Sequence, residues 1–156
     1  MPRRFENMTV IDLLHRASQC AEDLFDRHLG NIDLTARQYA ILRVVANSNS
    51  LTQTAIVEAT GIDRSTVAEM TRRLVEKGLV HRRRARSDAR AYAVRLTHAG
   101  RKMIDAVANA AMTSEEDLYG AVRSMPRAQF RNALVELIEA SEDAKRPATA
   151  RVERRR

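Results

Sequence analysis

The side chains of this 156-residue chain that could do chemistry are mostly cations, and they gather in one stretch. Residues 64–90 hold nine basic and three acidic side chains, residues 145–156 hold six and one, and the remainder is mildly acidic. A basic block within a chain of formal net charge +7 is typical of a protein that binds a polyanion. A solvated charged face would be the plain alternative. Nucleic acid is therefore the first partner to consider.

The order of side chains from Asp63 to Lys77-Gly78 predicts a helix with two unlike faces. At 100° per residue, one narrow arc is expected to face the core and holds Val67, Met70, Thr71 and Leu74. The opposite arc carries hydroxyl, carboxylate and guanidinium groups, from Ser65, Glu69, Arg72, Arg73 and Glu76. Such groups can contact base edges and phosphates in a major groove. Ion pairs within the helix, such as Glu69 with Arg72 or Arg73, are the alternative explanation of this face.

A second group of cations follows within a predicted hairpin, and its members are Arg82, Arg83, Arg84, Arg86 and Arg90. Tyr92, Val94 and Leu96 alternate with other residues, which predicts a strand with one buried face. Residues 79–84 are expected to pair with it, and the polar loop 85–90 would form the hairpin tip. A helix in the major groove and a hairpin in a neighbouring minor groove could then bind DNA together.

Helical periodicity and capping residues predict the elements that position these two segments. Apolar residues recur at three and four over residues 8–29, and Gly30 ends that helix. Thr35 and Gln38 form a capping box that begins the next helix. Thr52 and Asp63 then begin two short helices on either side of Thr60-Gly61, which is a helix-turn-helix arrangement.

The last third of the chain is also expected to be helical. Thr97 begins a long helix that runs to about Val122, and Pro126 is expected in the first turn of a final helix. Only five glycines and three prolines occur in the whole chain, which favours a mainly α fold. The basic segment 145–156 has almost no core-forming residues and is expected to be a mobile arm.

Several function classes are disfavoured by composition. The single cysteine, Cys20, excludes an internal disulfide framework and a thiolate zinc site, and the four histidines have no ligand spacing. No glycine-rich phosphate loop or catalytic triad can be read, so we expect neither an enzyme nor a cofactor. No apolar run reaches the length of a membrane span and the start lacks a signal peptide, so we expect a cytoplasmic protein.

The segment GIDRSTVAEMTRRLVEKGLV at residues 61–80 resembles the recognition region of the MarR family of bacterial winged helix-turn-helix transcription regulators. The family's wing signature D-x-R-x5-L-T-x2-G is met by Asp88, Arg90, Leu96, Thr97 and Gly100. The resemblance implies a DNA-binding lobe at about 35–97 with a two-stranded β wing. It also implies dimerisation helices at about 8–30 and 98–144, within a single domain 1–144 that forms a homodimer.

The residues expected to contact double-stranded DNA are polar or charged and lie on the helix or the hairpin: Arg64, Ser65, Thr66, Glu69, Arg72, Arg73, Arg82, Arg83, Arg84, Arg86, Asp88 and Arg90. The resemblance implies that Arg90 enters the minor groove and that Asp88 holds an arginine in position. A carboxylate in a phosphate-facing loop suits that role because it can orient guanidinium groups. A plain surface ion pair is the alternative for Asp88.

Many relatives sense aromatic acids in a cleft beside the DNA lobe, and others sense oxidants through cysteine. The candidate effector-binding residues here are His15, Cys20, Tyr39 and Arg43. We expect Cys20 to be a buried or half-buried structural thiol, because no second cysteine is present to resolve a sulfenic acid. Arg43 interrupts an apolar run and could bind a carboxylate, although an intramolecular ion pair is the favoured expectation.

Together these features predict a repressor that binds an inverted-repeat operator and releases it when a small organic anion binds, such as an aromatic acid or its thioester. A redox-responsive regulator acting through Cys20 and a ligand-free architectural DNA-binding protein are the alternatives.

Overall fold

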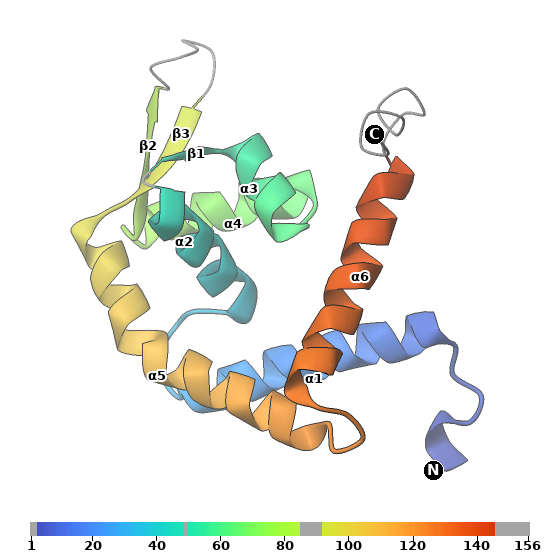
Figure 1. The fold of residues 1–156 in the computed structure, drawn as a ribbon. Helices are drawn as coiled ribbons and strands as arrows, with labels where there is room; N and C mark the ends of the chain where they lie inside the picture. The colour runs from blue at the N-terminus through green and yellow to red at the C-terminus, as the bar shows by residue number, and fades with distance from the viewer. Residues whose placement is uncertain (1–2, 49, 85–91, 146–156) are drawn as a thin grey trace. The chain divides into compact units, whose positions relative to one another are not determined.

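The computed structural model describes residues 3–48, 50–84 and 92–145, and these are mostly helical with one small antiparallel sheet (Figure 1). The chain divides into two units, Met1–Glu115 and Glu116–Arg156. A short 3-10 turn at Arg3–Phe5 precedes the first helix. The helices are α1 (Val10–Leu29), α2 (Ala36–Ser48), α3 (Gln53–Thr60), α4 (Arg64–Glu76), α5 (His98–Ala121) and α6 (Arg127–Lys145). The mainly α prediction is confirmed.

Side-chain caps begin the helices at the predicted positions. Thr35 Oγ1 accepts from the Gln38 backbone N–H at 3.2 Å while the Gln38 side chain accepts from the Thr35 N–H at 3.3 Å, which is the predicted capping box. Thr52 accepts from the Ala55 N–H at 3.2 Å at the start of α3. Gly61 ends α3 with a φ of 67°, a left-handed conformation that glycine adopts without strain.

The first helix begins with a capping box, formed by Thr9 and Asp12, that was not predicted from the sequence. Thr9 Oγ1 accepts from the Asp12 backbone N–H at 3.2 Å, and Asp12 Oδ2 accepts from the Thr9 N–H at 2.9 Å. Hydrogen bonds from Thr9 lower the pKa of the Asp12 carboxyl. The final helix differs by one residue from its prediction, because Pro126 lies directly before α6 and its carbonyl accepts from the Phe130 N–H.

The sheet has three strands in the order β1-β3-β2, where β1 is Leu51–Thr52, β2 is Val80–Arg84 and β3 is Tyr92–Leu96. The predicted hairpin is confirmed: β2 pairs antiparallel with β3, with Val80 opposite Leu96 and Arg82 opposite Val94. Its expected buried face is wrong at one end, because Tyr92 is exposed and Ala93 is buried instead. β1 pairs with the other edge of β3 and was not predicted. A strand of two residues, of which Thr52 is also the cap of α3, is too short to show the alternation that reveals a strand.

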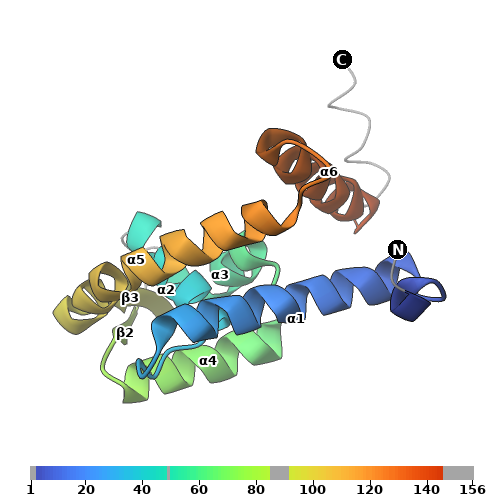
Figure 2. The same ribbon diagram turned by 90° about the horizontal axis from the view of Figure 1, so that it is seen from below.

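The core of the first unit lies beneath the helix-turn-helix. Its fully buried side chains come from α2, α3, α4, α5 and the sheet, and they include Ile41, Leu42, Val45, Ile56, Val67, Thr71, Leu74, Val80, Val94 and Val107. α1 joins this core through Phe25 and Leu29, which lie at the end of α1 that leads into α2 (Figure 2). The Phe25 ring stacks on Tyr39 with 5.2 Å between ring centroids.

The N-terminal half of α1 contributes little to that core. Val10 and Ile11 are 72% and 68% exposed, and Leu13 and Leu14 are also exposed. In the second unit, α6 exposes Leu134, Leu137 and Ile138, although its first turn is fixed by Arg127, which pairs with Glu116 at 2.6 Å and lies over the Tyr119 ring. Within the described ranges, no helix is both long and apolar enough to cross a membrane.

Candidate nucleic-acid interface

The helix α4 has the two faces that its sequence predicts. Val67, Thr71 and Leu74 are fully buried, and Met70 is half-buried against the same core. At the start of the helix, Asp63 Oδ1 accepts from the Thr66 backbone N–H at 2.9 Å and from the Ser65 hydroxyl at 2.5 Å. These bonds, with that of Ser65 the largest influence, hold the pKa of the Asp63 carboxyl far below its usual range. The Ser65 hydroxyl proton is therefore already used within the cap.

The exposed face of α4 carries a cluster of four charged side chains, Glu69, Arg72, Arg73 and Glu76. Glu69 Oε1 accepts from Arg72 Nη2 at 2.7 Å and from Arg73 Nε at 2.8 Å, while its Oε2 accepts from Arg72 Nε at 2.9 Å. Arg72 Nη1 donates to Glu76. The ion pairs that the sequence offered as the alternative explanation of this face are therefore present, and they involve the same residues that were expected to contact DNA.

The cluster is electrostatically self-contained. The guanidinium groups of Arg72 and Arg73 lower the pKa of Glu69 to about 2, and Glu69 raises the pKa of Arg72. Arg72, Arg73 and Glu76 are exposed and Glu69 is half-buried, with 44% of the Glu69 side chain accessible and 59% of that of Arg73. The formal charges of two carboxylates and two guanidinium groups cancel. The middle of this face of α4 is thus rich in donors and acceptors yet close to neutral.

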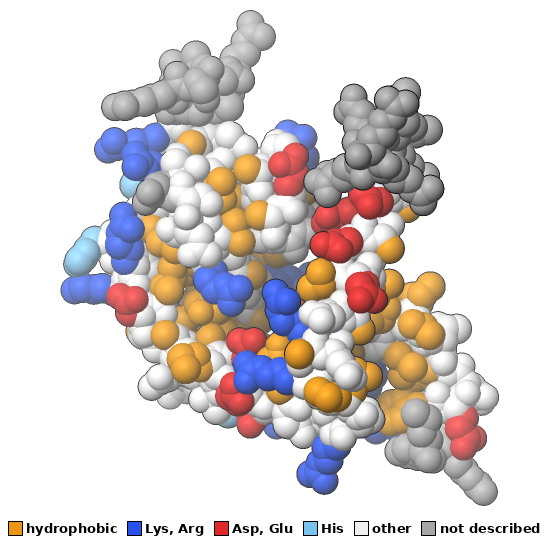
Figure 3. All heavy atoms as spheres, viewed as in Figure 1, with side chains coloured by type: hydrophobic (Ala, Val, Ile, Leu, Met, Phe, Trp, Pro, Cys, Tyr) orange, Lys and Arg blue, Asp and Glu red, His pale blue; other side chains and the backbone are white. Residues whose placement is uncertain are grey.

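The strand β2 presents a different kind of surface. Arg82 and Arg83 are exposed and lie opposite Val94 and Ala93 of β3. Among residues 3–48, 50–84 and 92–145, neither arginine has an ion-pair partner. Lys and Arg side chains are visible on the side of the lobe that carries β2 and the start of α5 (Figure 3). Arg84 ends β2, and the predicted Arg86, Asp88 and Arg90 lie outside the described residues.

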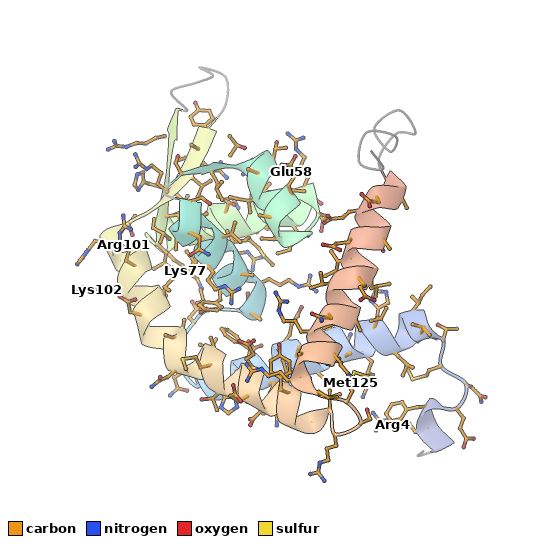
Figure 4. The ribbon with its side chains drawn as sticks, viewed as in Figure 1. Arg4, Glu58, Lys77, Arg101, Lys102 and Met125 are labelled. Atoms are coloured by element: carbon orange, nitrogen blue, oxygen red, sulfur yellow. The ribbon has the colours of Figure 1, made fainter. Side chains whose placement is uncertain are left out.

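Further polar residues near this face were not singled out from the sequence. Lys77 Nζ lies 2.6 Å from the Asp33 carbonyl oxygen and 2.8 Å from its carboxylate, so it ties the end of α4 to the segment before α2 (Figure 4). Arg101 and Lys102 add two exposed cations at the start of α5. Arg64 is exposed and Thr66 half-buried, as DNA-facing residues could be.

The junction between α4, the sheet and α5 is built on Thr97 and Gly100. Thr97 Oγ1 donates to the Gly78 carbonyl at 2.7 Å and accepts from the Gly100 N–H at 3.0 Å, and the Thr97 N–H donates to the Leu79 carbonyl at 3.0 Å. A Cβ on Gly100 would lie 2.1 Å from the Leu79 carbonyl oxygen, which is far inside contact distance. This close packing explains the glycine that ends the wing signature.

The effector residues expected from the sequence lie on α1 and α2, two helices that also border hollows of the first unit. A hollow of about 550 Å³ lies between α1, α2 and the α3–α4 turn, lined by Ser18, Glu22, Ala36, Arg37, Ala40, Thr60, Gly61, Ile62 and Asp63. A smaller one of about 300 Å³ lies between the start of α2 and α4. His15, Cys20, Tyr39 and Arg43 line neither hollow. His15 is exposed, and Tyr39 is half-buried against Phe25.

One expectation about an individual side chain is wrong, and another finds no support among the described residues. Cys20 is exposed, not a buried or half-buried thiol. It lies about 180° from buried Leu29 and about 140° from buried Phe25 around α1, so it faces away from the core. Arg43 is exposed on α2 and forms no ion pair with any residue whose placement is described, so the favoured intramolecular pair is absent there.

The comparisons with known proteins agree with this geometry. A sequence model of the MarR family matches residues 32–91. The transcriptional regulator HosA of Escherichia coli is 32% identical over 113 residues, which cover 69% of this chain and 84% of HosA. The chain belongs to the MarR family. The repressor NicR of Pseudomonas putida is 26% identical over 132 residues, which cover 85% of this chain and 84% of NicR.

Solved structures of MarR-type regulators have the same fold. BpsR of Bordetella bronchiseptica, whose DNA binding is regulated by 6-hydroxynicotinic acid, is 27% identical, with a TM-score of 0.74 over 92% of this chain and 99% of BpsR. A probable transcriptional regulator from Pseudomonas aeruginosa is 26% identical, with a TM-score of 0.77 over 86% of this chain and 99% of that one. The winged helix-turn-helix class is therefore confirmed, and the family relatives are transcriptional regulators.

Proposed function

We propose that this MarR-family chain is a homodimeric transcriptional repressor that binds an inverted-repeat operator through α4 and the β2–β3 hairpin. The observation that carries the proposal is the pairing of a donor-rich helix face, Glu69 to Glu76, with the exposed arginines of β2 in the same lobe. A recognition helix enters a major groove and reads base edges, while cations on a wing bind phosphates. The relation to NicR supports the repressor role.

The exposed apolar side chains support a dimer. Val10, Ile11, Leu134, Leu137 and Ile138 would be an unusual amount of apolar surface for a single chain in water, and burying them against a second copy would stabilise the assembly. Two recognition helices related by a two-fold axis would meet successive major grooves about 34–36 Å apart. An inverted repeat with that half-site spacing is therefore the expected operator.

A small organic anion is the proposed effector class. The support is BpsR, the relative whose DNA binding is regulated by 6-hydroxynicotinic acid. Such an anion would release DNA only if it binds more tightly to a conformation whose recognition helices no longer fit the groove spacing. His15 and Cys20 lie on the exposed face of α1, so they would line an effector site only where the second subunit covers that face.

The decisive experiment is selection of bound duplexes from fragmented genomic DNA, followed by fluorescence anisotropy with the selected site and a scrambled duplex of equal length. Retained binding at a large excess of random competitor supports the repressor, whereas equal affinity for every duplex supports the architectural alternative. Light scattering of the free protein and of the complex tests the dimer. A monomer that binds a single half-site with full affinity would contradict it.

A thiol-responsive regulator remains the second candidate because Cys20 is exposed. Aromatic acids and their coenzyme A thioesters are screened for DNA release with wild-type protein and with Cys20→Ser. An organic anion that releases DNA from both proteins supports the proposed effector class. Release by peroxide that is lost in Cys20→Ser, together with no response to any organic anion, supports the thiol switch.

A further inference from the structure

The carboxylate of Glu69 is the common partner of both arginines on the exposed face of α4. It accepts three hydrogen bonds, two from Arg72 and one from Arg73, over distances of 2.7–2.9 Å. Glu69, Arg72 and Arg73 are spaced at i, i+3 and i+4, so one carboxylate reaches both guanidinium groups without any change in the helix. Glu76 adds a bond to Arg72 alone.

The two arginines are left with different sets of unused donors. An arginine recognises guanine or a phosphate best with two parallel N–H groups. The Nε and Nη2 pair of Arg72 is occupied by Glu69, and its Nη1 also donates to Glu76. Arg73 uses only Nε, so both of its terminal nitrogens stay available within the described structure. Arg73 therefore keeps all four N–H groups of its terminal nitrogens for a two-donor contact, whereas Arg72 already gives three of its five N–H groups to carboxylates.

We propose that Glu69 is a positioning residue that sets DNA specificity: it orients Arg73 towards base edges and withholds Arg72 from random phosphates. This inference rests on the proposed function of α4 as the recognition helix. A phosphate that approaches the cluster meets two guanidinium groups already neutralised by carboxylates and gains little attraction. A base edge with two acceptors gains the oriented donors of Arg73. The carboxylate thus weakens binding to every sequence except those whose base edges match the remaining donors.

The weakness of exposed ion pairs makes this role compatible with a stable fold. More than two fifths of each side chain in the cluster is exposed, so water screens the attractions and their loss should leave the helix folded. The lowered pKa of Glu69 keeps its carboxylate charged at any pH near neutrality. The effect should consequently be visible in DNA selectivity and in salt dependence while thermal stability changes little.

The test replaces Glu69 by its uncharged isostere, Glu69→Gln, and compares it with Glu58→Gln. Glu58 lies on α3 of the same lobe and belongs to no ion pair among the described side chains, so its replacement makes the same change in net charge without touching the cluster (Figure 4). Affinity for the selected operator and for a scrambled duplex is measured across a range of salt concentrations. Circular dichroism and thermal melting check that each variant is folded.

We expect Glu69→Gln to bind the scrambled duplex more tightly than Glu58→Gln does. Its ratio of operator to scrambled affinity should fall about tenfold, because the two-donor contact of Arg73 loses its orientation. The slope of log affinity against log salt should steepen by about one for each arginine that gains a phosphate contact. In the free protein, the nuclear magnetic resonance signals of the Arg72 and Arg73 Nε–H groups should move in Glu69→Gln and stay in place in Glu58→Gln.

A second variant tests whether Arg73 recognises base edges, as the proposal requires. Arg73→Lys keeps the charge but removes the pair of terminal donors, so it should lower operator affinity and leave scrambled affinity nearly unchanged. Equal shifts in Glu69→Gln and Glu58→Gln on both duplexes would show a general charge effect and overturn the role of Glu69. If Glu69→Gln loses discrimination at a single base pair when operators with single substitutions are compared, Glu69 contacts a base itself and is not a positioning residue. A wild-type protein without any sequence preference would overturn the proposed function along with this inference.

Discussion

The exposed face of α4 and the strand β2 hold similar numbers of arginines in opposite electrostatic states. On α4, Arg72 and Arg73 are bonded to carboxylates three or four residues away. On β2, Arg82 and Arg83 are exposed and lack an acidic partner within the described ranges. A helix brings residues at i, i+3 and i+4 together on one face, whereas a strand places neighbours on opposite faces. Secondary structure therefore decides which cations are free to attract an anion.

This difference suggests a division of labour in the proposed complex. Free cations on a strand contribute sequence-independent attraction, which is strong at low salt and weak at high salt. Cations held by carboxylates contribute little attraction but keep a defined geometry, which favours contact with base edges. Substitutions at the junction between the two regions, within either region, or on the buried side of α4 test this division of labour.

The largest effect is expected at the junction, from Gly100→Ala. The new Cβ would lie 2.1 Å from the Leu79 carbonyl oxygen, and that carbonyl lies between the end of α4 and the start of β2. Either α5 or the strand must move, so we expect the free energy of unfolding to fall by about 3 kcal/mol. Urea denaturation followed by circular dichroism measures the change.

The matched control is Gly120→Ala on the same helix. A Cβ at Gly120 meets no atom within 4 Å, so alanine should raise stability by up to about 1 kcal/mol through its higher helix propensity. Equal changes in the free energy of unfolding for the two substitutions would show that the backbone near Gly100 moves to accommodate the new Cβ without loss of stability. The junction would then not fix the helix and the hairpin relative to each other.

The next effect concerns the free cations of β2. Arg82→Ala and Arg83→Ala should each weaken binding to the operator and to a scrambled duplex by the same factor, because phosphates occur in both. Each should reduce the salt slope by about 0.9 if its guanidinium neutralises one phosphate. Arg131→Ala, an exposed arginine of α6, controls for the change in net charge. A loss limited to the operator would assign base reading to β2 and reverse the division of labour.

Much of the fold could be predicted because its signals are local. Thr35 with Gln38, Thr52 and Asp63 mark helix starts by side chains that reach only three residues along the chain. The hairpin was visible because buried Val94 and Leu96 lie on either side of exposed Arg95, although Ala93 is buried as well. β1 was missed because its pairing with β3 joins residues about forty positions apart and leaves no periodic pattern.

The sequence predicted which residues form the candidate site but not whether their side chains are paired with one another. The sequence placed Glu69, Arg72 and Arg73 on one face and offered two explanations, DNA contact or ion pairing. The structure contains the ion pairs, and the two explanations are compatible once the unused donors of Arg73 are considered. Cys20 was misplaced because an apolar stripe leaves the flanks of a long helix uncertain, and about half a helix turn separates the buried face from the opposite, exposed one.

A smaller effect is expected on the buried side of α4, from Thr71→Val. Thr71 Oγ1 is fully buried and has no hydrogen-bond partner among the described residues, which is costly for a hydroxyl. Valine has nearly the same shape and removes the unpaired group, so stability should rise by about 1 kcal/mol. Thr113→Val on α5 is the control, because Thr113 is exposed and its hydroxyl donates to the Asn109 carbonyl at 3.0 Å. If Thr71→Val has the same free energy of unfolding as the wild type, the Thr71 hydroxyl of the wild type makes a compensating contact in solution.

The smallest effect is the acid sensitivity of the cluster on α4. The pKa of Glu69 in the folded protein is about 2, below its ordinary value of 4.5, because Arg72 and Arg73 favour the charged form. Its contribution to stability is therefore fully present above about pH 4.5 and is lost as the pH falls towards 2.

Unfolding by urea is compared for wild type and Glu69→Gln at several pH values in this window. The difference between the two proteins should shrink as the pH falls, and in Arg72→Ala/Arg73→Ala the same Glu69→Gln change should give a difference that varies less with pH. The effect is small because the cluster is exposed, and parallel curves for wild type and Glu69→Gln would mean that the carboxylate is not held by the two arginines in solution.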